Sequence, residues 1–345
     1  MHPTPANTAR PAVLPARTRG AGLEAGAPLT MLPSLPEVFA LVRPELQAAE
    51  AHLAELVQSE VPVVSSIGTY LTLAGGKRLR PLLTALGAGA VGHIPSPGLL
   101  CVGEMIHLGS LLHDDVVDEA PQRRGLPSAH RVYGNAGVVL TGDFCLARAV
   151  LLAASEGGHL TVTRLAEAVT AMAEGEVLQL QRAGDLSTTY AEYLETIDKK
   201  SAALISWCAA AGAYSEREGT KSRAMAEILA RYGREIGVAF QITDDVLDYQ
   251  PGTGKAQGQD LVERKLTLPL LLAMTREPRL RARVEAGDEV IGLCETVRDC
   301  GALADALTEA RVRVERAVGL LADLPPSPYV HALVVLGRHL VERAA

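Results

Sequence analysis

Apolar side chains recur at spacings of three and four residues along most of the chain, which is the pattern of one buried helix face. The pattern starts at about Glu37 and returns in separate stretches as far as the C-terminal part. We predict a helix over each stretch. The later ones cover roughly residues 79–91, 98–119, 135–155, 160–182, 189–214, 221–250 and 303–322.

Breaks rich in Gly, Pro and Ser separate these stretches, as at residues 95–98 and 251–254. Strand-like alternation is scarce, and no repeat of solenoid length occurs. The segment Gly137–Gly142 has the composition of a strand, but the helical rhythm continues beyond it, so we predict a helix there too. The chain is therefore predicted to be all-α, a single large helical bundle over residues 35–345. Residues 1–34 are rich in Pro, Ala and Arg and are predicted to be a disordered tail.

The amino-acid composition argues against nucleic acid as a partner and against a membrane-spanning segment. The chain has 345 residues, 48% of them hydrophobic, and a formal net charge of -7, so it lacks the basic field that holds nucleic acid. Its five cysteines are scattered and form no CxxC pair, which fits packing residues in a reducing cytoplasm. No uninterrupted apolar run reaches the roughly 18 residues that a membrane helix needs. We expect a cytoplasmic protein with at most transient membrane contact.

An acidic triplet interrupts one of the apolar helices. Asp114, Asp115 and Asp118 follow Leu111, Leu112 and His113, and the acids at positions i and i+4 share one helix face. Like charges there repel each other unless a cation lies between them. Carboxylate oxygens suit Mg²⁺, which completes its coordination with water and phosphate.

The same arrangement returns in a later helix, where Asp244, Asp245 and Asp248 again stand among apolar residues. Two helices that present carboxylates to each other inside a bundle would form a site for several Mg²⁺ ions. Such a site could hold both phosphates of a diphosphate. The repetition makes coincidence a poor explanation.

Basic residues form equally local groups. They are Lys77, Arg78 and Arg80; Arg123 and Arg124; Lys199 and Lys200; and Lys255 and Lys265. Arginine matches phosphate oxygens in a bidentate manner and lysine supplies a point charge, so these groups could hold a second diphosphate beside the metal-bound one. Two anions imply two substrates.

These motifs, in this order, resemble those of the trans-polyprenyl diphosphate synthases, and the resemblance covers about residue 35 to the C-terminus. It rests on residues 76–81, the two Asp-Asp-x-x-Asp motifs, Arg123-Arg124-Gly125, Lys200-Ser201, Gln241, Lys255 and residues 265–269. The resemblance implies a helical bundle around a central cavity. It also implies a Mg²⁺-dependent condensation of isopentenyl diphosphate with an allylic prenyl diphosphate.

The resemblance further implies roles for individual residues. Asp114, Asp118 and Asp244 would be the main ligands of about three Mg²⁺ ions, with Asp115, Asp245 and Asp248 binding metal or supporting the ligands. The isopentenyl diphosphate clamp would consist of Lys77, Arg80, His107 and Arg124. The allylic diphosphate would contact Arg123, Lys200 and Lys255, with Lys265 nearby. Ser201 and Gln241 would lie near the developing allylic cation, and the leaving diphosphate would take the proton. The family also implies a homodimer.

Two positions depart from the family pattern. Ser201 stands where many relatives have Thr, which keeps the hydroxyl group. Arg264 stands where Gly is common, which puts the conformation of the loop before Lys265 in question.

Product length depends on the residues just before the first acids. Gly109 and Ser110 precede Asp114 by five and four positions, and both are small. In the family a bulky aromatic residue there resembles a floor that stops growth, so we expect a product of about twenty carbons or more.

Several alternatives stay open from the sequence: a farnesyl-length synthase, a terpene cyclase, and a non-catalytic partner subunit of a heteromeric synthase. Cyclases usually carry a different second metal motif, and partner subunits have typically lost an acidic motif. A di-iron site is disfavoured because Glu104-x-x-His107 has no second copy.

Overall fold

The computed structural model describes residues 33–73, 78–119, 121–123, 125–214, 219–251 and 257–342. From Pro33 onward the chain forms one compact unit. The predicted tail over residues 1–34 falls almost wholly outside the described residues, and so do Lys77, Arg124 and Lys255.

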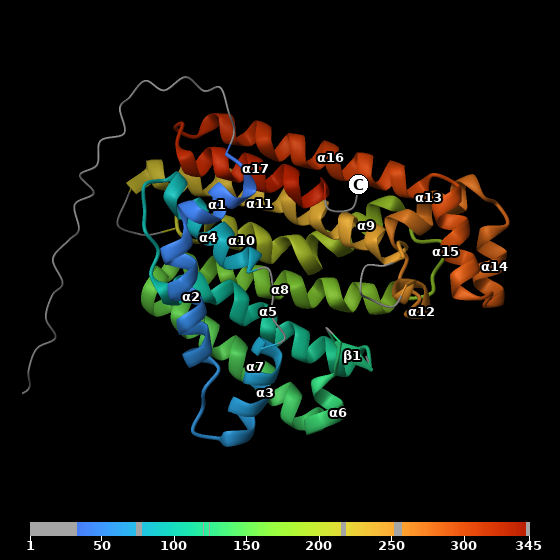
Figure 1. Cartoon of the computed structure of the whole chain (residues 1–345), viewed down its shortest axis with the longest axis horizontal. Helices are drawn as coiled ribbons and strands as arrows, with labels where there is room; N and C mark the ends of the chain where they lie inside the picture. Colours follow the sequence, from blue (N-terminus) through green and yellow to red (C-terminus); the bar gives the residue numbers. More distant parts are fainter. Residues whose placement is uncertain are drawn as a thin grey trace, which may run out of the picture. The chain divides into compact units, whose positions relative to one another are not determined.

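The described part is built almost entirely of helices (Figure 1). The α-helices are α1 Leu35–Leu41, α2 Arg43–Leu56, α3 Pro62–Leu73, α4 Leu79–Ala90, α5 Pro97–Val117, α6 Ala129–Tyr133, α7 Asn135–Leu152, α8 Gly158–Arg182, α9 Tyr190–Ile197, α10 Ala203–Ala211, α11 Gly219–Asp248, α12 Gln259–Val262, α13 Leu268–Arg276, α14 Leu280–Ala286, α15 Val290–Asp299, α16 Ala302–Leu320 and α17 Pro328–Glu342. The other elements are the π-helical turns η1 Ala153–Gly157 and η2 Asp198–Ala202, the 3-10 turn η3 Leu321–Asp323, and the two-residue strands β1 Gln122–Arg123 and β2 Leu126–Pro127.

The predicted all-α fold is confirmed, and each long predicted helix is present. Residues 137–142, which had the composition of a strand, lie inside helix α7. The single helix expected from Glu37 onward is divided at Val42; α2 begins at Arg43, with Pro44 in its first turn. The predicted ranges did not include helices α3, α6, α12, α13, α14, α15 and α17.

Local signals explain where the helices near the acidic motifs begin. Ser96 precedes α5, its hydroxyl accepts a 3.2 Å hydrogen bond from the amide of Leu99, and Pro97 occupies the first turn. Thr189 and Glu192 form a reciprocal capping box at the start of α9. These caps satisfy backbone donors that have no partner within the helix.

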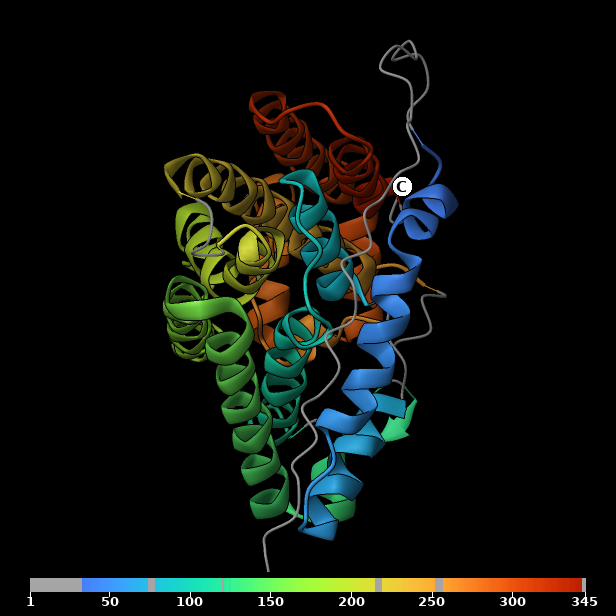
Figure 2. The same cartoon turned by 90° about the vertical axis from the view of Figure 1, so that its left-hand side faces the viewer.

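Helix α5 is buried along most of its length and packs chiefly against α7, and also against α2 and α4. The longest helix, α11, packs against α10 and α16. Helices α11, α16 and α17 run alongside one another, as Figure 1 shows; Figure 2 shows the same unit turned by 90°. Because α5 and α11 lie in the interior, their acidic residues are held inside the bundle.

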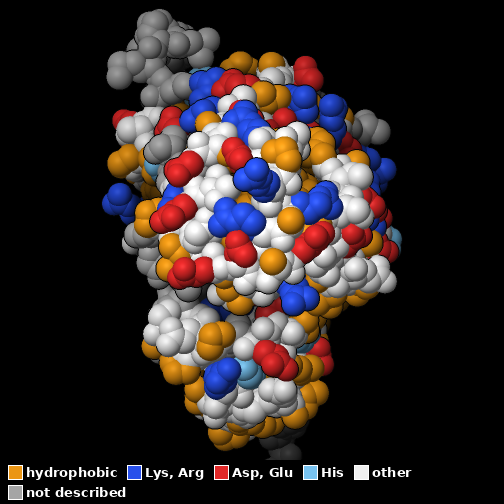
Figure 3. All heavy atoms as spheres, turned by 90° about the vertical axis from the view of Figure 1, so that its right-hand side faces the viewer, with side chains coloured by type: hydrophobic (Ala, Val, Ile, Leu, Met, Phe, Trp, Pro, Cys, Tyr) orange, Lys and Arg blue, Asp and Glu red, His pale blue; other side chains and the backbone are white. Residues whose placement is uncertain are grey.

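A smaller core adjoins the main one. It gathers Tyr249, just after α11, with residues of α13, α14 and α15, including Leu270, Leu280 and Val297. Figure 1 shows these elements together at one end of the unit, and Figure 3 shows basic and acidic side chains interspersed on that face. All five cysteines are unpaired and four of them are buried.

One continuous helical segment, Asn135–Arg182, is long and apolar enough to cross a membrane by length and composition alone. About a third of its most apolar window, 33%, is buried inside the protein. Leu140, Leu151 and Val177 on this segment are more than half exposed, at 65%, 61% and 53%. The segment therefore carries an apolar surface that the described part of the chain does not cover.

Candidate active site

The first acidic motif lies at the C-terminal end of α5. Asp115 is fully buried and accepts a short hydrogen bond from Nε of Arg123, which strand β1 brings back toward the helix. Asp118 follows the last residue of the helix, and its amide donates to the carbonyl of Asp114. The motif is thus held by its own helix and by the short hairpin that follows it.

Asp114 is the member whose charge is least favoured. Burial raises the pKa of its carboxyl group to about 6. Lys200 and Arg123 act in the opposite direction, while Glu176 and Asp118 add to the increase. A buried carboxylate among other carboxylates, with too little positive charge around it, is a suitable ligand for a divalent cation.

The second acidic motif belongs to a chain of hydrogen bonds between helices. The Ser201 hydroxyl donates to Oε1 of Gln241 at 2.6 Å, and Nε2 of Gln241 donates to Asp245 at 2.8 Å. Tyr193 on α9 donates to the other oxygen of Asp245 at 2.7 Å. Asp245 is 4% exposed, and burial raises the pKa of its carboxyl group although both hydrogen bonds oppose the change.

Asp248 organises the segment that follows α11. Its two carboxylate oxygens accept backbone hydrogen bonds from Gln259 and Asp260, each at 3.1 Å, at the start of α12. Burial raises the pKa of Asp260, and the nearby charges of Asp245 and Asp248 add to the increase. Asp244 is half-buried.

Lys265 lies between the first acidic motif and Asp260, which adjoins the second motif. Its Nζ lies 3.4 Å from Oδ2 of Asp118, and it also forms a short ion pair with Glu263. Burial lowers the pKa of Lys265, but these carboxylates hold it above its ordinary value. The charge of Lys265 is also felt by Asp260, next to the second motif. Lys265 is therefore a cation between two groups of acids.

A cavity of about 130 Å³ lies between α8, α9, η2, α11 and the segment before α13. Its lining includes Lys200, Ser201, Gln241, Asp245, Asp260 and Lys265. Five of the six residues were predicted from the sequence, and Asp260 was not. Across the described ranges, no three His, Cys, Asp or Glu side chains are gathered into a ready-made metal site.

A π-helical turn aims Lys200 and Ser201 at this cavity. Residues Asp198–Ala202 form η2 between α9 and α10, and such turns often occur at functional sites. Lys200 pairs with Glu176 on α8 at 2.5 Å. Gly175 permits this approach, since a Cβ atom there would lie 2.4 Å from the Lys200 amide nitrogen.

The first basic group is organised by a buried acid. Arg78 adopts a left-handed conformation (φ 48°) before α4 and pairs with Glu50 at 2.7 Å and with Glu104 at 3.1 Å. Arg80 lies 3.9 Å from Glu104, which is 3% exposed. Oε2 of Glu104 and Nε of Arg80 are buried and have no hydrogen-bond partner among the described residues. His107 is half-buried one turn further along α5.

Gly109 faces a neighbouring helix. A Cβ atom at this position would meet the carbonyl oxygen of Gly142 at 3.0 Å and Leu146 at 3.2 Å, both on α7. The Ser110 hydroxyl donates to the carbonyl of His107 within α5. The expectation that a bulky residue at Gly109 limits product length stays a prediction, and such a side chain would also press against α7.

Sequence reasoning did not identify Tyr193, Glu176, Glu104 or Asp260 as parts of the site. Each acts through a partner distant in sequence, so no local motif marks it. In the sequence, Glu104 stands out only as part of the Glu-x-x-His pattern of di-iron sites.

Comparison with known proteins gives a consistent result. The family model for polyprenyl synthetase matches residues 61–292. The octaprenyl diphosphate synthase of Haemophilus influenzae is 38% identical over 328 residues, covering 90% of this chain and 98% of that protein. The Escherichia coli octaprenyl diphosphate synthase is 35% identical, covering 90% and 99%.

Solved structures agree. A polyprenyl synthase from Caulobacter crescentus, crystallised with calcium and isoprenyl diphosphate, superposes with a TM-score of 0.84 at 36% identity, covering 91% of this chain and 99% of that one. A decaprenyl diphosphate synthase from Rhodobacter capsulatus superposes with a TM-score of 0.81 at 35% identity, covering 90% and 100%.

Proposed function

Because this chain belongs to the polyprenyl synthetase family, which acts on isopentenyl and allylic diphosphates, we propose that it makes products of octaprenyl to decaprenyl length. The chain is a trans-prenyltransferase that forms a product of about twenty carbons or more, and the named relatives favour the long end of that range. The observation that supports diphosphate chemistry at this site is the small cavity lined by Lys200, Lys265 and Asp245 of the second acidic motif.

Magnesium is the proposed metal, and the donor set fits it. Asp114 and Asp118 on one side and Asp244 on the other would hold the ions, which supply positive charge to the diphosphate of the allylic substrate. Asp115 is engaged by Arg123, and Asp248 by two backbone amides. These two acids are therefore proposed to position the ligands, and Asp245 to support Asp244 from the adjacent position.

Residues of the chain would assist the reaction in three ways. Lys200 and Lys265, with Arg123, would place fixed positive charge beside the departing diphosphate, which lowers the barrier most where water is excluded. Ser201 and Gln241 would present oriented dipoles to the allylic cation. Lys77, Arg80, His107 and Arg124 would bind isopentenyl diphosphate, with Lys255 on the allylic diphosphate.

The decisive experiment is product analysis. Purified chain is incubated with Mg²⁺, radiolabelled isopentenyl diphosphate and, separately, geranyl, farnesyl or geranylgeranyl diphosphate. A ladder of diphosphates that ends at one length supports the proposal and gives the carbon number. Cyclic hydrocarbon products would favour a terpene cyclase. Failure to extend any starter would favour a non-catalytic partner subunit.

The proposed assembly is a homodimer in the cytoplasm, with transient membrane contact during release of the apolar product. The uncovered apolar surface of α7 and α8 supports the homodimer. Leu140 and Leu151 are both exposed and lie about three turns apart on one face of α7, where a second copy of the chain could cover them. Sedimentation of a Leu140→Glu, Leu151→Glu double variant tests it, with Ile94→Glu as an equally exposed control. A dimer that persists in the double variant would reject this interface.

A further inference from the structure

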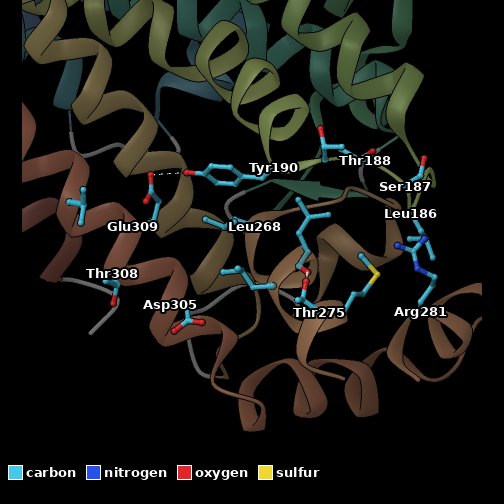
Figure 4. A pocket seen from close by; sticks show the side chains of 15 residues that line it. Leu186, Ser187, Thr188, Tyr190, Leu268, Thr275, Arg281, Asp305, Thr308 and Glu309 are labelled. Atoms are coloured by element: carbon cyan, nitrogen blue, oxygen red, sulfur yellow. Dashed lines mark hydrogen bonds between the residues drawn. The ribbon is translucent and has the colours of Figure 1, made fainter. Parts of the chain in front are cut away.

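A larger cavity, of about 640 Å³, lies beside the catalytic one. It opens between the segment before α9, helix α13, the start of α14 and helix α16 (Figure 4). Its volume is within the roughly 300–1,000 Å³ of typical ligand pockets. None of the catalytic roles proposed above uses the side chains that line it.

The inner wall of this cavity is apolar. Its apolar residues are Leu186, Leu268, Leu271, Leu272, Met274 and Val312. Two lining residues keep much of their surface in water, since Val312 is 40% exposed and Tyr190 is 44% exposed. A ligand with an apolar chain would remove this surface from water, which stabilises the complex in proportion to the area covered.

The carboxylates at the rim already have partners. Asp305 forms an ion pair with Arg276. Glu309 pairs with Arg313 at 2.9 Å and accepts a 2.7 Å hydrogen bond from Tyr190, drawn in Figure 4. The charge of each carboxylate is therefore already balanced by an arginine, so neither acid favours a cationic ligand.

Arg281 is the charged lining residue whose hydrogen-bond donors are available to a ligand. Among the described residues, its guanidinium makes no hydrogen bond and no ion pair. Its charge reaches Asp185, but that exposed carboxylate already accepts two hydrogen bonds from Ser187, at 2.9 and 2.6 Å. Figure 4 shows Arg281 near Leu186 and Ser187, across the cavity from Asp305 and Thr308. The cavity thus combines an apolar wall with one available cation at its edge.

We propose that this cavity binds an anionic amphiphile, with its apolar chain against Leu268, Leu271 and Val312 and its head on Arg281. A guanidinium binds phosphate and carboxylate heads through the same forked donors. Prenyl phosphates and fatty acids share this chemistry, so the two sources have to be separated by experiment.

Helix α13 connects this cavity to the catalytic one. Thr267 lines the catalytic cavity and the next residue, Leu268, lines the second, while Thr188 lines both. Lys265 precedes this junction by two residues. A ligand that immobilises α13 therefore acts on the segment that carries Lys265.

Hydrogen exchange measured by mass spectrometry tests the proposal on the full chain with Asp114→Asn and EDTA, so that metal-dependent binding at the catalytic site is removed. The two probes are farnesyl monophosphate and myristate. We expect slower exchange over residues 186–190, 268–275 and 305–312. Arg281→Gln should weaken binding about tenfold, the lower end for a charge-assisted hydrogen bond. Val312→Trp should narrow the cavity where the apolar chain would lie and weaken binding.

Ile291→Trp is the matched control, because Ile291 is an exposed apolar residue on α15 outside this cavity. It should bind like the parent chain. Protection by farnesyl monophosphate alone identifies a prenyl ligand, by myristate alone a fatty acid, and by both the shared chemistry. No protection in the three segments, or equal binding after Arg281→Gln, would overturn the proposal. The product assay on the wild-type chain tests prenyl transfer separately, so failure of ligand binding in this cavity would not count against the proposed function.

Discussion

The hydroxyl of Tyr193 on α9 donates a 2.7 Å hydrogen bond to the buried carboxylate of Asp245 on α11. This bond favours the ionised carboxylate, against the burial that raises its pKa. Tyr193 itself is 3% exposed, so water cannot readily replace its hydroxyl. The charge of the second acidic motif therefore depends on a residue more than fifty positions earlier.

Replacing Tyr193 by Phe should raise the pKa of Asp245 further and leave more of it protonated at neutral pH. We expect Mg²⁺ activation at pH 7 to require about tenfold more metal, as for loss of one hydrogen bond to a charged group. The defect should shrink as the pH rises, because Asp245 then ionises regardless. Initial rates against Mg²⁺ concentration at several pH values measure both effects.

Tyr190→Phe is the control, since it removes a hydrogen bond of the same helix, to Glu309, outside the catalytic cavity. It should leave the Mg²⁺ requirement unchanged. A Tyr193→Phe defect that is equal at every pH would show that the hydroxyl acts through packing alone.

Asp114→Asn should abolish turnover and stabilise the metal-free protein at pH 8. Below the ordinary pKa of an aspartate, the residue is protonated in both folded and unfolded chains. Above about pH 6 the folded chain carries a buried charge. Asn removes that cost, so the free energy of unfolding should rise by about 1–3 kcal/mol. The gain should decrease as the pH falls from about 6 toward 4.

Urea unfolding in EDTA at pH 8 and pH 4.5 gives the comparison. Asp185→Asn serves as the control because Asp185 is exposed and its pKa is lowered, not raised. A loss of stability in Asp114→Asn at pH 8 would contradict the electrostatic account.

Binding of Mg²⁺ near pH 6 should release the protons that Asp114 still carries. At that pH Asp114 is about half protonated, and a metal displaces the proton of a carboxyl ligand. Affinity should fall about tenfold per pH unit below 6 for each proton displaced. Calorimetry in two buffers of different ionisation enthalpy measures the release. Identical heats in both buffers would show that Asp114 does not bind the metal.

Most of the framework could be predicted from sequence because the long helices carry continuous apolar periodicity. Helices α5 and α11 were found together with their acids. The short helices α14 and α15 were not, since they are stabilised by the small core around Tyr249 and show little pattern of their own. The hairpin that brings Arg123 to Asp115 is only two residues wide on each side, too short to predict from alternation.

Contacts between segments that are distant along the chain could not be predicted from the sequence either. The periodicity of α5 could not show that Glu104 lies between Arg78 and Arg80, or that Gly109 faces α7. The π-helical turn that orients Lys200 reads in sequence as ordinary helix.

Aromatic substitutions at Gly109 and Ser110 should differ in their effects. Gly109→Phe forces a side chain against the backbone of Gly142, so it should cost about 1–3 kcal/mol of stability through overpacking. Ser110 is half-buried and its hydroxyl bonds only its own helix, so Ser110→Phe should cost less and shorten the product. Thermal unfolding and chromatography of the products measure the two effects. Unchanged product length in Ser110→Phe would show that growth is limited elsewhere.

Arg264 holds a left-handed conformation, with φ 56°, at the position where the family commonly has Gly. A side chain in this region costs roughly 1–2 kcal/mol, while glycine adds roughly 0.5–1 kcal/mol of chain entropy to the unfolded state. Arg264→Gly should therefore raise the free energy of unfolding by about 0.5–1 kcal/mol, measured by urea denaturation. Arg264→Ala is the matched control, because it removes the same long side chain but keeps the Cβ atom that causes the strain. Equal stability of the Gly and Ala variants would mean that the guanidinium group, not the backbone, governs this loop.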